Sequence, residues 1–325
     1  MEELPSIQSI KGTLDKNFGR YKGLLSNPDT SPFEGSGIFS NRRLTRKAWV
    51  FSGIITEEYI IGFAIVDAGY IGTAFCYLWD RKNQVYLEEK SDRFFGFPES
   101  FNPSLSSDWS LEDGAKKWSF RKKDNQYIVS FIGKKINLEY SLTETENGVS
   151  VIAPSKDRPF HFTYKNMNLK ANVKLNMNGE NINFEGYFGT IDFSKGFPPR
   201  ETFWNWASLS GVTEDGKSFA LNLVTIFNDG LENILWLDEK IIPLGKAKFH
   251  YNQPISKNNT SVTTEDEIIE FNFFPEGERS ENLNVLVLKS NFTQAFGKFE
   301  GKVNLKNKIL KIKGFGLLEE HTAVW

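Results

Sequence analysis

The residue types that can carry out acid–base chemistry are densest between Gly186 and Gly211, in the stretch GYFGTIDFSKGFPPRETFWNWASLSG. A carboxyl group in a partly apolar pocket has a raised pKa and can act as a general acid, which makes Asp192 a candidate catalytic residue. Polar and aromatic side chains that could orient this acid or contact a ligand follow within a few residues: Arg200, Trp204, Asn205 and Trp206.

The same stretch also has a purely structural interpretation. An arginine–carboxylate pair can fix the joint between two domains, with both tryptophans in the core. Pro198 and Pro199 remove two backbone donors, so a regular helix or central strand cannot run through them. The pattern predicts a strand end over residues 187–191, a stiff connection, and a new strand that opens at Trp204. Both interpretations stay open at this point.

A second polar cluster follows the tryptophans. Asn222 lies in the apolar run FALNLV and needs hydrogen-bond partners if it is buried. The tip Asn228-Asp229-Gly230 is more typical of a turn than of a site, because Asp-Gly pairs favour hairpin turns. Asn222 and Glu232 are the ligand-binding candidates in this cluster.

The third cluster is the run Glu319-Glu320-His321 near the end of the sequence. Histidine titrates near neutral pH and a neighbouring carboxylate tunes it, so this run could supply an acid–base pair. Glu320 and His321 join Asp192 as candidate catalytic residues. A structural role for the run, with Trp325 holding down the last strand, is an equally good interpretation.

The sequence offers little for a metal or a nucleotide. It contains three histidines far apart and one cysteine, Cys76, which excludes an intrachain disulfide and a cysteine-based zinc site. Glycine-rich phosphate loops, nucleophile elbows and zinc-protease motifs are absent from the sequence. We therefore expect neither a metal nor another cofactor.

Composition narrows the class of protein. The chain has 325 residues, with 39 Lys and Arg against 41 Asp and Glu, so no net positive field favours nucleic acid. The first residues, MEELPSIQSI, do not resemble a secretory signal, and no apolar run is long enough to span a membrane, so we expect a cytoplasmic protein. The 29 phenylalanines indicate a hydrophobic interior larger than a minimal core requires.

Period-two alternation recurs along the chain and predicts strands with one buried face. Apolar side chains alternate with polar ones in at least four segments: residues 136–140, 173–177, 269–273 and 310–313. Turn signals such as Asn147-Gly148 and Asn178-Gly179 separate the segments. A long amphipathic helix is not evident, so the chain is predicted to be all-β and antiparallel.

Two internal matches indicate a duplicated unit. Residues from Phe51 match residues from Leu209, and residues from Phe162 match residues from Phe292; the second match places Glu320 where the first copy has Asp192. Because closed barrels hide strand edges, each copy is predicted to be a β-barrel. The predicted organisation is an irregular arm (1–36), a first barrel (37–192), a connection (193–203) and a second barrel (204–325).

Several motifs resemble those of a bacterial family described only as domain of unknown function 2804: FEGSGIFSNRRLTRKAW, WNWASLSG, NDGLENILWLD and GFGLLEEHTAVW. The resemblance covers residues from about Phe33 to Trp325. The chain departs from the family where it reads ALNLVTIFNDGLEN, which is shorter than the usual text and has Phe227 in a tryptophan position. More distantly, the chain is similar to the tandem lipocalin-like superfamily of carotenoid hydratases, tocopherol cyclase and fungal Diels–Alder cyclases.

That resemblance implies two tandem antiparallel lipocalin-like (calycin-type) β-barrels with a hydrophobic ligand pocket. The expected function is binding of a lipid or isoprenoid-like small molecule in a barrel or at the barrel joint. One alternative is a cofactor-independent hydratase, cyclase or isomerase that uses a carboxylate acid on an isoprenoid-like double bond. Another is carbohydrate binding or glycoside hydrolysis, since tryptophan faces and paired carboxylates also serve sugars.

Overall fold

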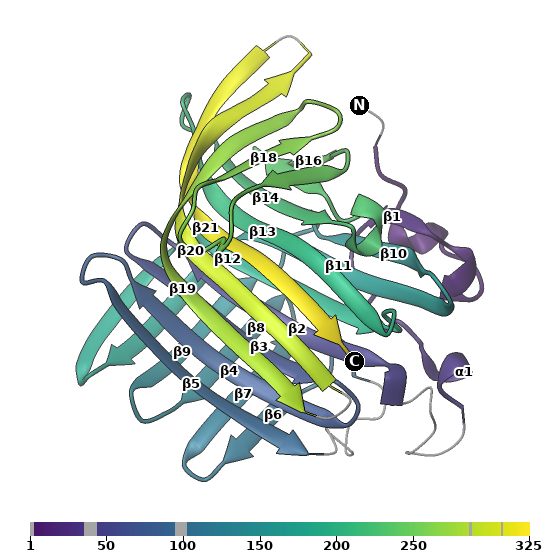
Figure 1. Ribbon diagram of the computed structural model, residues 1–325, viewed down its shortest axis with the longest axis horizontal. Helices are drawn as coiled ribbons and strands as arrows, with labels where there is room; N and C mark the ends of the chain where they lie inside the picture. The colour runs from purple at the N-terminus through teal and green to yellow at the C-terminus, as the bar shows by residue number, and fades with distance from the viewer. Residues whose placement is uncertain (1–2, 36–43, 95–102, 286–287, 307) are drawn as a thin grey trace.

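In the computed structural model of the chain, the described residues (3–35, 44–94, 103–285, 288–306 and 308–325) form two antiparallel sheets, each rolled into a barrel (Figure 1). The first sheet contains β1 (Gly19–Lys22), β2 (Lys47–Ile55), β3 (Tyr59–Asp67), β4 (Ile71–Asp80), β5 (Val85–Phe94), β6 (Trp109–Asp113), β7 (Lys116–Lys123), β8 (Gln126–Ile132), β9 (Ile136–Thr143), β10 (Val149–Ser155), β11 (Arg158–Met177) and β12 (Glu180–Gly196). The second contains β13 (Glu201–Thr213), β14 (Ser218–Thr225), β15 (Ile234–Leu237), β16 (Lys240–Pro243), β17 (Ala247–His250), β18 (Thr260–Thr264), β19 (Ile269–Val285), β20 (Leu288–Leu305) and β21 (Lys308–Val324). The predicted all-β fold of two tandem lipocalin-like barrels is confirmed.

Helical structure is limited to short segments in the described residues. They include one helical turn, α1 (Ser31–Glu34), and three 3₁₀ turns, η1 (Ile7–Ser9), η2 (Leu14–Lys16) and η3 (Phe227–Gly230). The N-terminal segment is not wholly irregular, because β1 pairs with β10 and extends the first sheet. The expected boundary between residues 36 and 37 lies outside the described residues.

The two barrels share one strand order. The first runs β5-β4-β3-β2-β12-β11-β9-β8-β7-β6, and the second runs β16-β15-β14-β13-β21-β20-β19-β18-β17. In both, four consecutive strands form a meander and the last strand of the barrel returns beside the first. The strand β12 continues to Gly196 and β13 begins at Glu201, so the connection between the barrels is short.

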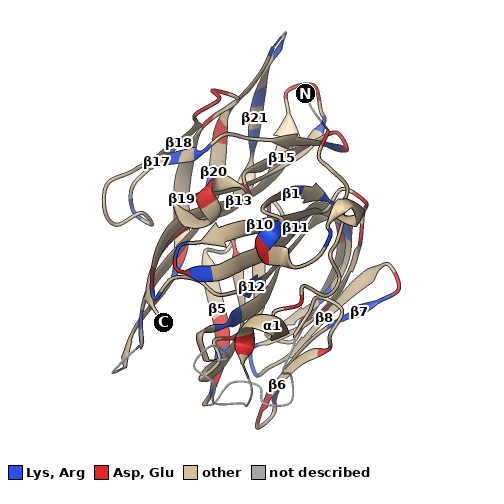
Figure 2. Cartoon of the chain, turned by 90° about the vertical axis from the view of Figure 1, so that its right-hand side faces the viewer, with Lys and Arg blue, Asp and Glu red and all other residues tan. Residues whose placement is uncertain are grey.

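The apolar positions of the alternating segments point into the barrels. Ile136, Leu138 and Tyr140 belong to the core of the first barrel, and Phe271 and Phe273 to that of the second. Because neighbouring side chains on a strand point to opposite faces, the alternate positions face solvent or, in the strands near the centre, the other barrel. Lys, Arg, Asp and Glu are interspersed over the strands and loops (Figure 2).

The barrels contact one another through the outer faces of their central strands. A separate cluster of buried side chains fills this joint: Phe51, Ile60, Ala64, Tyr77, Trp79, Trp206, Val224, Phe296 and Leu317. The rings of Phe51 and Trp206 meet edge to face with centroids 5.7 Å apart. Polar groups also cross the joint, since Arg81 forms a bidentate pair with Glu276 at 2.7 and 2.8 Å. The joint is therefore packed as a core rather than as a loose contact.

No helix in the described part of the chain combines the length and the hydropathy that a membrane crossing requires.

A pair of glycines on β13 and β21 lets these strands approach closely. Gly211 and Gly314 face each other in the register, and a Cβ on Gly314 would lie 2.2 Å from the carbonyl oxygen of Ser210. We predict that Gly314→Ala lowers the free energy of unfolding by about 1–3 kcal/mol, because the backbone must move to admit the methyl group. Urea unfolding measures the loss. Thr322→Ala, at an exposed position of the same strand, should cost less than about 1 kcal/mol; equal losses for both variants would contradict the close approach.

Candidate functional site

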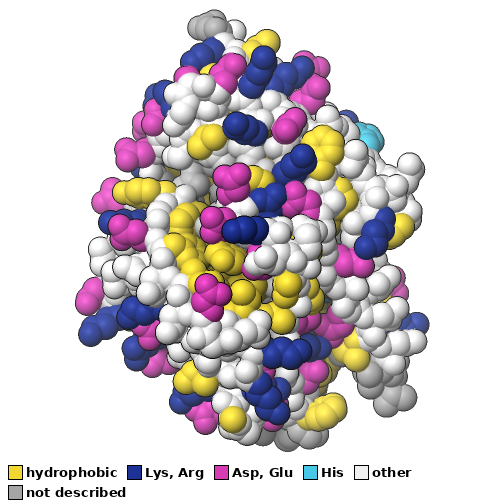
Figure 3. Space-filling model, turned by 90° about the vertical axis from the view of Figure 1, so that its left-hand side faces the viewer, with side chains coloured by type: hydrophobic (Ala, Val, Ile, Leu, Met, Phe, Trp, Pro, Cys, Tyr) yellow, Lys and Arg dark blue, Asp and Glu magenta, His cyan; other side chains and the backbone are white. Residues whose placement is uncertain are grey.

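A cavity of about 220 Å³ lies in the joint between the two barrels. Its lining comes from both halves of the chain: β2, β3, β4, β5, β11 and β12 on one side, and β13, β14, η3, β19, β20 and β21 on the other. On one face of the molecule, hydrophobic side chains line a hollow bordered by acidic and basic ones (Figure 3). The site therefore exists only when both barrels are present.

Aromatic side chains form much of the cavity wall. They are Trp49 and Phe51 from β2, Phe75 from β4, Trp204 and Trp206 from β13, Phe227 from η3, Phe292 from β20 and Trp325, which follows β21. Trp204 packs against Phe227 with ring centroids 5.4 Å apart. Such rings provide large apolar area with few rotatable bonds and bind flat or cationic ligands well.

The strand register places polar groups beside these rings in two ladders. In the first barrel Asp192 on β12 pairs with Phe51 on β2 and with Lys165 on β11. In the second barrel Glu319 on β21 pairs with Trp206 on β13 and with Gln294 on β20. Each ladder thus presents one carboxyl group between an aromatic ring and a hydrogen-bond donor.

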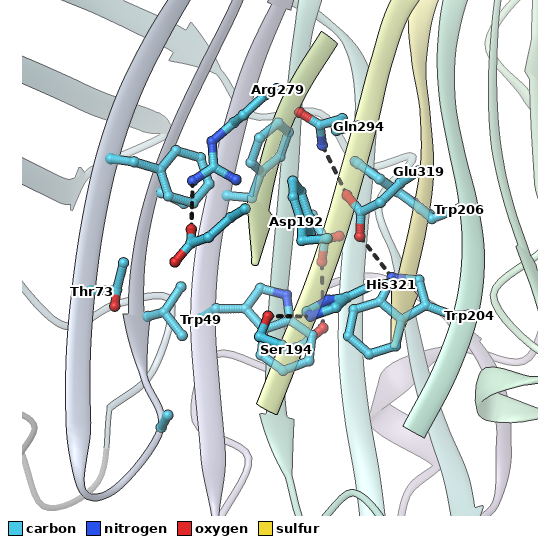
Figure 4. Close-up of a pocket in the computed structure, with 18 of the residues that line it drawn as sticks. Trp49, Thr73, Asp192, Ser194, Trp204, Trp206, Arg279, Gln294, Glu319 and His321 are labelled. Atoms are coloured by element: carbon cyan, nitrogen blue, oxygen red, sulfur yellow. Dashed lines mark hydrogen bonds and ion pairs between the residues drawn. The ribbon is translucent and has the colours of Figure 1, made fainter. Parts of the chain in front are cut away.

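Glu319 is the buried acid of the second barrel, and only 6% of its surface is exposed. The indole Nε1 of Trp204 donates to Oε1 at 2.7 Å, and Nε2 of Gln294 donates to Oε2 at 2.9 Å (Figure 4). The hydroxyl of Tyr77 donates to Oε1 of Gln294 at 2.5 Å, which fixes the orientation of the amide. Burial raises the pKa of Glu319 to about 7 in spite of the two donors. The carboxyl therefore exchanges its proton near neutral pH.

Asp192 is the buried acid of the first barrel and forms an ion pair with Lys165. The same ammonium lies 2.9 Å from Oε2 of Glu232, so Lys165 forms ion pairs with two carboxylates at once. Burial, with repulsion from Glu232, raises the pKa of Asp192, while the Lys165 charge opposes that shift. Burial alone would lower the pKa of Lys165, but the two carboxylates outweigh it and the pKa is raised.

Arg279 lies in the cavity wall near β5, and its side chain is 4% exposed. Its Nε donates to Glu88 at 2.8 Å and its Nη2 to Glu281 at 3.3 Å. The guanidinium also covers the ring of Phe75, 4.1 Å from the centroid. Arg279 is thus neutralised by two carboxylates and held flat against an aromatic face.

His321 lies among aromatic rings, 4.3 Å from Trp204 and 5.2 Å from Phe292 between centroids. Its Nε2 is 2.8 Å from the hydroxyl of Ser290, another residue that lines the cavity. Burial, with the charge of Arg279, lowers the pKa of His321 to about 3. The imidazole is therefore neutral at physiological pH and can exchange a hydrogen bond with Ser290.

The structure brings five of the predicted site residues to the cavity: Asp192, Trp204, Trp206, Glu232 and His321. Their roles as catalytic or ligand-binding groups remain predictions. Asp192 and Glu319 approach the cavity from opposite barrels, and Figure 4 shows both near His321 and the tryptophans.

The other four predicted residues do not line the cavity. Glu320 points to the opposite face of β21, where Tyr251 and Gln253 donate to it. Asn205 also points away from Trp204 and Trp206, and its Nδ2 donates to Tyr251 at 2.9 Å. The side-chain period of a strand explains both positions.

Asn222 and Arg200 lie outside the cavity for different reasons. Asn222 is buried behind the wall, where it accepts from Nε1 of Trp206 at 2.9 Å and donates to the carbonyl of Glu232 at 2.8 Å. It is placed to orient Trp206. Arg200 is exposed in the short connection between β12 and β13.

The repeat match between Asp192 and Glu320 differs from the structure by one residue. Phe51 and Trp206 meet at the joint, and their paired neighbours are Asp192 and Glu319. Sequence reasoning placed Glu319 in the third cluster but did not select it, and it missed Lys165, Gln294 and Arg279. Glu319 could have been selected from the alternation of side chains along a strand, because His321 and Glu319 are two residues apart and must point to the same face. Lys165, Gln294 and Arg279 stand in no recognisable motif.

The described residues contain no group of three or more His, Cys, Asp or Glu side chains that could hold a metal ion.

Fold and site together define a tandem lipocalin-like β-barrel protein with an aromatic, acid-containing cavity between its barrels. The model of the family "Domain of unknown function (DUF2804)" matches residues 5–325, and the chain belongs to that family. No curated protein matches the chain in sequence.

Two solved structures share the fold. A protein from Nitrosomonas europaea, provisionally assigned as AttH, has a TM-score of 0.54 and 16% identity, over 85% of this chain and 92% of that one. Kievitone hydratase from Nectria haematococca has a TM-score of 0.52 and 12% identity, over 93% of this chain and 97% of that one. At these sequence identities the comparison shows that the three proteins share a fold, and nothing more.

The raised pKa of Glu319 predicts a pH-dependent stability. The folded-state pKa of about 7 lies above the usual value of 4.5, so the folded state holds this proton more tightly than the unfolded state does. The stabilisation is complete below pH 4.5 and is lost as the pH rises to 7, by about 3 kcal/mol. Urea unfolding across this range measures the loss.

The matched variants are Glu319→Gln and Glu320→Gln, which make the same change one residue apart on opposite faces of β21. Subtracting the profile of each variant from that of the wild type cancels the other titrating groups. The difference should slope between pH 4.5 and 7 for Glu319→Gln alone. A flat difference for Glu319→Gln would show that this carboxyl titrates normally.

Proposed function

We propose that the cavity in the barrel joint binds a small hydrophobic molecule. The observation that carries the proposal is the cavity itself: about 220 Å³ of space lies among eight tryptophan and phenylalanine side chains, in a joint otherwise packed as a core. The cavity opens on one face of the molecule, so in the absence of a ligand its apolar lining is in contact with water. A bound hydrophobic molecule removes that apolar surface from water.

The fold supports the same function. A solved structure with this architecture is kievitone hydratase, whose name makes it an enzyme. In this chain the hydrogen bonds around Trp204, Trp206 and Gln294 hold the cavity wall in one conformation. A preformed wall lowers the entropy lost when a ligand binds.

Binding can be tested with an apolar fluorescent probe such as Nile red, together with organic extraction and mass spectrometry of the purified protein. Val66→Trp places a larger side chain on the cavity wall and should reduce probe affinity at least tenfold. Val212→Trp is the control, because Val212 is 43% exposed on β13 and outside the cavity. Wild-type protein that yields no extracted ligand and binds no probe would refute the proposal.

The buried carboxyl of Glu319 favours a second candidate function, acid–base catalysis on an isoprenoid-like double bond. Both oxygens of Glu319 accept a hydrogen bond from the protein. The proton of the acid form is therefore not needed for either bond and can be directed into the cavity. A general acid works best when its pKa is near the operating pH, which fits a value of about 7.

The corresponding hydration balances without a cofactor. Glu319 gives its proton to one alkene carbon, and the positive charge that develops on the other carbon lies against the tryptophan faces. Water adds to that carbon, and the proton it releases returns to the Glu319 carboxylate. In this scheme neutral His321, or Asp192 across the cavity, accepts a hydrogen bond from the attacking water.

Solvent deuterium provides a test without knowledge of the natural substrate. Incubation of a panel of isoprenoid alkenes with the protein in D₂O should incorporate deuterium at the protonated carbon, detected by mass spectrometry. Glu319→Gln should reduce the rate at least 100-fold, while Glu320→Gln retains it. Exchange that survives Glu319→Gln would assign the proton to another group.

A further inference from the structure

The cavity wall carries more acidic than basic side chains. The ionisable residues that line it are five acids and two bases, apart from neutral His321: Asp92, Asp192, Glu232, Glu281, Glu319, Lys165 and Arg279. At one end, Arg279 and Lys90 pair with three acids: Glu88, Glu281 and Asp92. At the other end, Asp192, Glu232 and Glu319 share a single ammonium, that of Lys165, so the larger excess of acids lies there.

That end of the cavity is almost fully buried. Asp192, Glu232 and Glu319 are 7%, 3% and 6% exposed, and one ammonium, that of Lys165, is paired with two of them. Burying a carboxylate without a matching charge costs several kcal/mol, and in the empty site this cost raises the pKa of Glu319. A positive charge supplied by the ligand would remove this cost.

The rings around these acids have the geometry that recognises cations. Nζ of Lys165 already lies 5.7 Å from the centroid of the Trp206 ring, beside its ion pair with Asp192. The indole N–H of Trp204 donates a hydrogen bond to Glu319, so the Trp204 ring lies next to the carboxyl group. Aromatic faces backed by carboxylates form the sites that bind alkylammonium groups in water.

We propose that the ligand of this cavity is an organic cation, a hydrophobic amine or quaternary ammonium whose charge lies between Glu319, Asp192 and the faces of Trp204 and Trp206. The inference rests on the proposed function and narrows it, because it names the charge of the hydrophobic molecule. The apolar part of the ligand occupies the space along Phe51, Phe75 and Phe292.

Binding of such a cation depends on the protonation of Glu319. The titratable and charged groups that act on it or line the cavity beside it come from several strands: His321 on β21, Arg279 on β19, Asp192 on β12, Lys165 on β11 and Tyr77 on β4. Of these, His321 stays neutral and Tyr77 stays protonated between pH 5 and 8. Raising the pH through about 7 ionises Glu319 and should strengthen cation binding.

The test compares two probes of one shape, benzyltrimethylammonium and its neutral isostere neopentylbenzene, by displacement of Nile red from the wild-type protein. At pH 8 the cation should bind at least tenfold more tightly than the isostere. Its affinity should fall at least threefold at pH 5.5, while that of the isostere stays constant. Glu319→Gln should remove this pH dependence and Glu320→Gln should retain it.

The outcomes separate the two proposals. Equal affinity for both probes, or preference for the neutral one, overturns the cation inference and leaves hydrophobic binding in place. If neither probe binds and Nile red does not bind either, the proposed function fails and the inference fails with it. Should Glu319→Gln not fold, the pH series on the wild-type protein decides alone.

Discussion

The feature on which the rest of the structure depends is the burial of two barrel walls against each other. Outer faces of antiparallel barrels usually meet water and carry polar side chains. Here the outer faces of β2, β12, β13 and β21 meet one another, so their polar groups lose solvent. Each buried carboxyl must then find a hydrogen-bond or charge partner within the joint or shift its pKa. The chemistry of the cavity follows from that requirement.

The two halves of the joint meet the requirement in different ways. Asp192 faces an ammonium group, that of Lys165, and forms an ion pair with it. Glu319 occupies the matching place in the second barrel but faces an amide and an indole, which are neutral donors. The same strand order thus yields an ion pair in one half and a titratable acid in the other. The difference comes from the residue paired with each acid, which is Lys165 in the first barrel and Gln294 in the second.

The architecture was largely predictable from the sequence, because period-two alternation and the repeated segments are local signals. Residues such as Leu138, Val173 and Phe271 point inward as the alternation requires. Asn178 and Gly179 both have positive φ angles in the turn between β11 and β12, as their types favour.

The site was predictable only in part. Asp192, Trp204 and Trp206 were selected because they lie in one short stretch that is dense in ionisable and aromatic residues. Glu320 was selected where the structure places Glu319, since a sequence match tolerates a shift of one residue that reverses the face of a strand. Arg279 and Lys165 reach the cavity through pairing of distant strands, and the sequence contains no local signal for that pairing.

The central claim is that contact between the barrels keeps a carboxylic acid partly protonated at neutral pH. Infrared difference spectroscopy measures this directly, because a protonated carboxyl group has a C=O stretching band that a carboxylate lacks. The account predicts a band that titrates near pH 7, is absent from Glu319→Gln and is present in Glu320→Gln. A wild-type spectrum in which this band has disappeared by pH 5 would contradict the account.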